Sequence, residues 1–199
     1  GNVEKAFNIN IIDNVFWSKL GSDIDGEAAS DESGYSVSLS SDGTIVAIGS
    51  RLNNGISDHI RFRSGHVRIY EYKPYTDDMS GNYHYENTTQ KNNQLLPLII
   101  TGGTEPIAGN SYWTQLGSDI DGESSGHLSG WSVSLSSDGK IVAIGSIIND
   151  DVKGHVTIYE YSNDNWVKLG YDIDGEDIFD HSGYSVSLSS DGKIVAIGA

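Results

Sequence analysis

Apolar residues and serines alternate strictly over residues 35–40. A period of two predicts a β-strand with one apolar face and one polar face. The pair Asp42-Gly43 follows, and Asp-Gly is typical of a tight hairpin because both residue types tolerate positive φ. The next run, Ile45–Gly49, is apolar at consecutive positions and predicts a central strand covered on both faces. Helical periodicity is absent, so the pattern predicts an all-β fold.

This strand-turn-strand pattern belongs to a longer block that occurs three times without internal gaps. The copies span Trp17–Gly49, Trp113–Gly145 and Trp166–Gly198. A third strand is expected at His66–Tyr72, which returns as His155–Tyr161, and the segment from Trp17 to Ile24 predicts a fourth. The repeating unit is therefore about fifty residues long and has four short antiparallel strands.

We divide the chain into one domain of three repeats, at about 1–50, 65–146 and 154–199. The first copy carries two insertions, at 51–64 and 73–112. Since the chain starts and stops between the same two strands, we expect the three units to be an incomplete ring. Further units of a longer polypeptide, or a second copy of the chain, would complete it.

A four-stranded sheet with apolar residues on both faces cannot bury itself, so neighbouring units are expected to stack against it. Stacked four-stranded sheets are the blades of a β-propeller. The small residues Ala47 and Gly49 and the serines of residues 36–40 would allow close approach between blades. A β-trefoil, which also has three four-stranded repeats, is the alternative fold.

The block Val133–Ser146 followed by Gly154–Tyr161 resembles a propeller blade. It is similar to WD repeats and, more closely, to the FG-GAP-like repeats of large surface and secreted proteins. This chain departs from those patterns because it has no Trp-Asp dipeptide, lacks the longer calcium loop, and has serine where phenylalanine would precede glycine. The resemblance implies a propeller blade and leaves the function open.

Composition narrows the range of partners. The chain has 12 basic and 28 acidic side chains and a net charge of −16, which disfavours nucleic acid and anionic membranes because phosphate binding needs clustered positive charge. It contains no cysteine, so disulfides and thiolate metal sites are excluded. Its apolar runs are far shorter than the roughly 20 residues of a membrane span, so no membrane insertion is expected.

Each repeat carries the sequence Asp-Ile-Asp-Gly-Glu, here called the acidic motif. Alternate carboxylates of an extended segment point the same way, and calcium prefers such oxygen ligands. The spacing does not fit an EF-hand loop, and a solvated turn is the competing interpretation. The predicted calcium ligands are Asp23, Asp25, Glu27, Asp119, Asp121, Glu123, Asp172, Asp174 and Glu176.

Two groups of residues in the first unit are predicted to bind a partner. All four arginines of the chain lie close together, and we expect a basic patch that docks on the acidic motif of a neighbouring blade or subunit. Tyrosines of the long insertion are the second group, because insertions of repeat proteins often carry binding loops. These residues are Arg51, Arg61, Arg63, Arg68, Tyr75, Tyr83 and Tyr85.

Repetition also bears on activity. His66 and His155 recur beside glycine and are expected to make structural hydrogen bonds, and no nucleophile elbow occurs. An active site is normally built once, so chemistry that recurs in every unit argues against an enzyme. We therefore expect a non-catalytic extracellular, cell-surface or virion-surface module for protein binding, adhesion or structural assembly, with calcium as a stabiliser. A glycan-binding lectin is the first alternative, and a hydrolase is the second.

Overall fold

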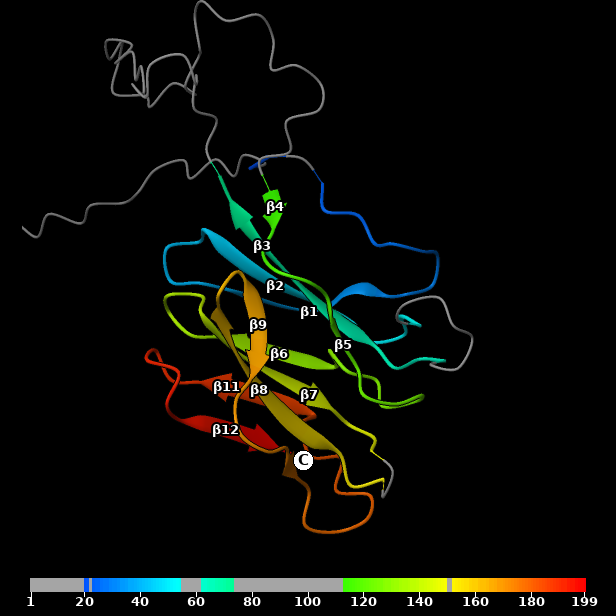
Figure 1. Ribbon diagram of the computed structural model, residues 1–199. Helices are drawn as coiled ribbons and strands as arrows, with labels where there is room; N and C mark the ends of the chain where they lie inside the picture. The colour runs from blue at the N-terminus through cyan, green and yellow to red at the C-terminus, as the bar shows by residue number, and fades with distance from the viewer. Residues whose placement is uncertain (1–19, 22, 55–61, 74–112, 150–151) are drawn as a thin grey trace, which may run out of the picture.

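The computed structural model describes residues 20–21, 23–54, 62–73, 113–149 and 152–199. These residues form twelve β-strands in antiparallel sheets, with no helix among them. The prediction of an all-β fold is therefore confirmed. Three sheets lie one below another in chain order (Figure 1), and the described strands do not close into a ring.

The first sheet takes its fourth strand from the next copy of the repeated block. β1 (Ser33–Leu39), β2 (Ile45–Ser50) and β3 (His66–Tyr72) pair in order, and β4 (Trp113–Gln115) and β5 (Ile120–Asp121) both pair with β3. β4 lies along one end of β3 and β5 along the other. The two short strands thus form one interrupted edge strand.

The second sheet repeats this arrangement. Its strands are β6 (Ser132–Leu135), β7 (Ile141–Ser146), β8 (His155–Ser162), β9 (Asn165–Lys168) and β10 (Ile173–Asp174). β9 and β10 again share one edge of β8. In the described residues the third sheet contains two strands, β11 (Ser185–Leu188) and β12 (Val195–Gly198). The sequence predicted three equal four-stranded sheets. The described residues instead form two larger sheets and one two-stranded sheet.

Serines of the alternating strands join successive sheets. The Ser36 hydroxyl donates to the Gly130 carbonyl at 2.7 Å, and the Leu135 amide donates to the Ser38 hydroxyl at 2.9 Å. The same pair of bonds joins the second sheet to the third, through Ser132 and Ser134. The polar faces of β1 and β6 therefore pack on the next sheet, and Val133 and Leu135 of β6 are buried against the first sheet.

Glycine at the end of the second strand permits this stacking. A Cβ on Gly49 would lie 2.3 Å from the Gly130 carbonyl oxygen, and one on Gly145 would lie 2.2 Å from that of Gly183. No side chain fits at such a distance. The apolar core between the first and second sheets includes Ala47, Val67, Ile69, Val133, Leu135, Val142 and Ile144.

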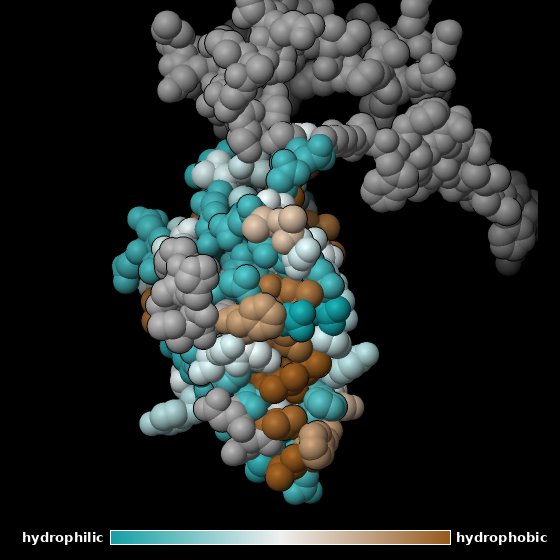
Figure 2. Space-filling model, turned by 90° about the vertical axis from the view of Figure 1, so that its right-hand side faces the viewer, coloured by the Kyte–Doolittle hydropathy of each residue, from teal (hydrophilic) through white to brown (hydrophobic). Residues whose placement is uncertain are grey.

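Hydrophobic residues also reach the surface. On the side shown in Figure 2, they form a strip that runs along the stack, with hydrophilic residues on both sides. In the part of the chain that the structure describes, no helix has the length and apolar character needed to span a membrane.

Candidate functional site

The second and third acidic motifs lie where the chain leaves one sheet and enters the next, and the first motif lies before the first sheet. Residues 120–121 and 173–174 of the second and third motifs form β5 and β10, at the edge of the third strand of their sheets. The glutamate that ends each motif begins the connection to the following sheet. The edges of the first and second sheets therefore each meet two motifs, the one before the sheet and the one that closes it.

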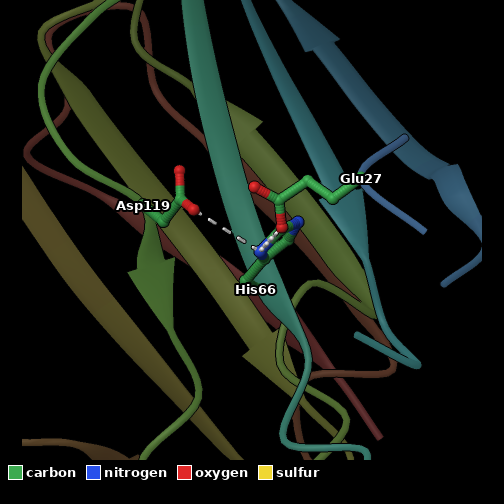
Figure 3. A group of neighbouring side chains, drawn as sticks. All are labelled: Glu27, His66 and Asp119. Carbon is green, nitrogen blue, oxygen red and sulfur yellow. Dashed lines mark ion pairs between the residues drawn. The ribbon is translucent and has the colours of Figure 1, made fainter. Parts of the chain in front are cut away.

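This topology brings one histidine between two motifs. Glu27 precedes the first sheet, His66 begins β3, and Asp119 lies just before β5 (Figure 3). The Nδ1 atom of His66 is 3.7 Å from Glu27 Oε2 and 4.0 Å from Asp119 Oδ2. We call Glu27, His66 and Asp119 the first Glu-His-Asp cluster.

His66 is buried without a hydrogen bond at this nitrogen. Its side chain is 1 % exposed, and Nδ1 has no hydrogen-bond partner. Burial lowers the pKa of His66 below its ordinary value, although Asp119 and Glu27 act in the opposite direction. Burial therefore favours the neutral form of the ring. Leaving a buried nitrogen without a hydrogen bond costs free energy. Such a nitrogen therefore needs an explanation, for example a bound ligand or a catalytic role.

Arg68 lies beside the first cluster. Its Nη2 donates to the Asp25 carbonyl oxygen at 2.8 Å, and its Nη1 is 3.8 Å from Glu27 Oε1. The guanidinium thus faces Oε1 of Glu27, whereas His66 faces Oε2 of the same carboxylate. Glu27 Oε2 also accepts a hydrogen bond from the Asn53 side chain at 3.1 Å.

An equivalent cluster occurs in the second sheet, formed by Glu123, His155 and Asp172. Here Lys168 of β9 places its ammonium 2.7 Å from Glu123 and 2.8 Å from Asp172. Burial opposes the charge on Lys168, but hydrogen bonds to Asp172 and Glu123 outweigh it and raise its pKa above the ordinary value. We call this group the second Glu-His-Asp cluster.

The two clusters take their positive charge from different strands. Arg68 and Thr157 occupy the same position on β3 and β8, two residues after the histidine. Gln115 and Lys168 occupy the same position on β4 and β9, two residues after the tryptophan. Beside the first cluster, the third strand carries the cation and the edge strand carries the neutral side chain. Beside the second cluster, the third strand carries the neutral side chain and the edge strand carries the cation.

The calcium prediction grouped the three carboxylates of one motif, and the structure groups carboxylates of successive motifs. In the described residues, the two sets of acidic and histidine side chains close enough to share an ion are the two Glu-His-Asp clusters. The Asp174 carboxylate instead accepts from Asn149, and the Glu176 carbonyl accepts from Lys153. Asp23, Asp25 and Asp121 lie outside both clusters. Calcium binding stays a prediction.

The described arginines have separate surroundings. Arg51 pairs with Glu32 at 2.6 Å and stacks over the ring of Tyr35, with its guanidinium carbon 3.8 Å from the ring centre. Arg63 lies over the ring of Phe62 at 4.8 Å. Arg68 contacts Asp25 and Glu27 of the acidic motif that precedes its own sheet. Docking of an arginine patch on a neighbour stays a prediction, and Arg61, Tyr75, Tyr83 and Tyr85 lie outside the described residues.

An aromatic row, which sequence reasoning missed, crosses the three sheets. Tyr35, Trp131 and Tyr184 each follow a glycine, at the start of β1 and just before β6 and β11, and successive ring centres are 5.1 and 5.6 Å apart. Tyr35 and Tyr184 are exposed. The repeated position was visible in the sequence, but only stacking of the sheets shows that the rings form one continuous surface.

Comparison with known proteins adds no family. No protein-family model and no curated protein sequence matches this chain.

Proposed function

We propose that this chain is a non-catalytic β-propeller segment that acts in protein binding, adhesion or structural assembly at an extracellular, cell or virion surface. The single observation that carries the proposal is the serial stacking of its sheets by one repeated set of contacts. The chemistry of the Glu-His-Asp clusters also recurs at equivalent positions, as expected of a structural motif. A propeller places four-stranded sheets around an axis in this serial manner.

Both end faces of the stack carry the residues that the internal interfaces use. Val37 and Leu39 of the first sheet are 63 % and 60 % exposed, whereas the equivalent Val133 and Leu135 are 8 % and 7 % exposed because the first sheet covers them. We call the surface of the first sheet around Val37 and Leu39 the leading face. It is the surface on which a preceding sheet would pack.

The opposite end presents the complementary surface. Ser185 and Ser187, which correspond to the bonding serines of the first sheet, are exposed on β11. Ile194 is 70 % exposed, whereas the equivalent Ile141 packs against Gly192 of the next sheet. We call this surface the trailing face. The trailing face of one molecule therefore matches the leading face of another, which is a heterologous, head-to-tail interface.

Sedimentation velocity with two charge variants tests this assembly. Wild type is expected to form dimers or larger species, and Leu39→Lys and Ile194→Lys are each expected to remain monomeric. Mixing the two variants is expected to restore a dimer but no larger species, because each variant keeps one intact face. Val167→Lys, at an exposed position on the edge strand β9, is the control. A wild type that stays monomeric, or a mixture that does not dimerise, would contradict the proposal.

The aromatic row supports a second candidate function, a glycan-binding lectin. Exposed aromatic rings provide flat apolar surfaces with polar edges, which suit sugar rings. Glycan-array binding that is lost in Trp131→Ala would support this candidate, and unchanged binding would exclude the row as the site. The hydrolase alternative gains no specific support from the described residues.

A further inference from the structure

The first Glu-His-Asp cluster gathers ligand atoms from three separate segments. We propose that Glu27, His66 and Asp119 bind a divalent transition-metal ion of the zinc class. One nitrogen and two carboxylate oxygens lie within 4.8 Å of one another. Ligand atoms of a tetrahedral zinc ion lie about 3.4 Å apart, so the measured 3.7 and 4.0 Å between His66 and the two carboxylates need only small movements.

The buried nitrogen of His66 is the observation that distinguishes this cluster from an ordinary group of acidic residues. Nδ1 is aimed at Glu27 and Asp119 (Figure 3), and it lacks a hydrogen-bond partner. A metal ion would satisfy that nitrogen and both carboxylates together. Imidazole suits zinc, copper, cobalt and nickel, whereas calcium is bound by oxygen ligands. The donor set therefore favours a transition metal over calcium.

The second cluster already holds a cation of its own. The Lys168 ammonium lies within 3 Å of Glu123 and Asp172, where a metal ion would otherwise sit. In the first cluster the equivalent residue is the neutral Gln115, whose side chain donates to Asp119 at 2.6 Å. We therefore infer that the first cluster is open to an ion and that Lys168 closes the second.

Arg68 sets the affinity of the first cluster. Its positive charge is close to Glu27 and would repel a bound cation, but it contacts Oε1 and not the oxygen that faces His66. Replacing Arg68 with threonine, the residue at the equivalent position of the second sheet, is expected to tighten metal binding by about tenfold because a nearby like charge is removed.

Titration of the full chain with Co²⁺, followed by visible absorption, and with Zn²⁺, followed by calorimetry, tests the site. We expect one ion per chain at the first cluster, and excess Ca²⁺ should not displace it. Glu27→Gln is expected to weaken binding by at least roughly tenfold. Glu176→Gln is the matched control, because Glu176 ends the third motif but belongs to neither cluster. Circular dichroism confirms that each variant is folded.

Lys168→Gln gives the opposite readout, since it replaces the cation of the second cluster with the residue found at the equivalent position of the first sheet. This variant is expected to bind a second ion, which Glu123→Gln should then abolish. Absence of metal binding by the wild type, or binding unchanged by Glu27→Gln, would overturn the proposal. If Lys168→Gln binds no second ion, the Glu-His-Asp geometry is not what determines metal binding, and the assignment is overturned.

Discussion

Individual side chains of the repeated block have defined tasks that the sequence indicated only in part. Asp42 was predicted to take positive φ with Gly43, but only the glycine does so, at 73°. The aspartate serves instead as a hydrogen-bond acceptor for the Ser40 hydroxyl at 2.7 Å and the Thr44 amide at 3.0 Å. Asp138 and Asp191 accept the same bonds in the other sheets. The predicted hairpin turn at Asp42-Gly43 is confirmed, but the aspartate stabilises it through side-chain hydrogen bonds and not through a positive φ.

These bonds predict a pH dependence at the residue scale. The hydrogen bonds from Thr44 and Ser40 lower the pKa of Asp42 from 3.8 to about 2. A carboxylate with a lowered folded-state pKa stabilises the fold above its unfolded pKa of about 4, and this contribution is lost as the pH falls through about 2. An NMR titration of the Asp42 carboxyl carbon should show the low midpoint. Ser40→Ala should raise it, and a wild-type midpoint near 3.8 would contradict the prediction.

At the scale of elements, the sheets depend on small residues and serines at their interfaces. Strand β1 keeps its serines on one side because of its period of two, and the following sheet accepts and donates hydrogen bonds at the same positions. The indole nitrogen of Trp166 adds a bond of 2.7 Å to the Leu116 carbonyl, which joins the outer strands of neighbouring sheets. Hydrogen bonds therefore join the first and second sheets both at their first strands and at their outer strands.

Gly49→Ala is expected to destabilise the fold by about 1–3 kcal/mol, because the added methyl group would overpack the interface. The Cβ would meet the rigid carbonyl oxygen of Gly130. Gly198→Ala is the matched control, since its Cβ would meet only atoms of Ser185 in its own sheet, and no sheet of the described residues follows it. Urea unfolding of both variants measures the difference. Equal losses of stability would show that the sheet interface is not the cause.

At the scale of the whole molecule, the same contacts join the first sheet to the second and the second to the third. The residues that make one side of this interface are exposed on the leading face, and those that make the other side are exposed on the trailing face. Leu39 and Ile194 contribute exposed apolar surface to the leading and trailing faces, respectively. Exposed apolar surface of this kind favours association because burial removes it from water. A net charge of −16 opposes association at low ionic strength.

A concentration-dependent melting temperature should follow from this association. Binding of a second copy stabilises the folded state by mass action, so the thermal midpoint of the wild type should rise with protein concentration. Added salt should strengthen the effect because it screens repulsion between acidic chains. Leu39→Lys should melt at one temperature at all concentrations. A midpoint independent of concentration in the wild type would contradict assembly through these faces.

The sequence alone determined the all-β class, the hairpin turns and the repeat, because side-chain periodicity and turn chemistry are local properties. It also identified the acidic motifs, including Glu27 and Asp119, as sites of concentrated carboxylates. It could not show that these two carboxylates, 92 positions apart in the chain, meet at His66. That meeting depends on the fourth strand of each sheet coming from the next copy of the block, which is a property of strand pairing across the chain.

Tertiary structure likewise decided which copies of a repeated residue are buried. Val37 and Val133 occupy nearly identical sequence surroundings, yet the first is exposed and the second is in the core. The difference arises because only the second has a sheet packed against it. Likewise, the cation beside each cluster comes from β3 in one sheet and from β9 in the other, which only the packed strands reveal. The sequence determined what each unit contains, and stacking determined what each residue contacts.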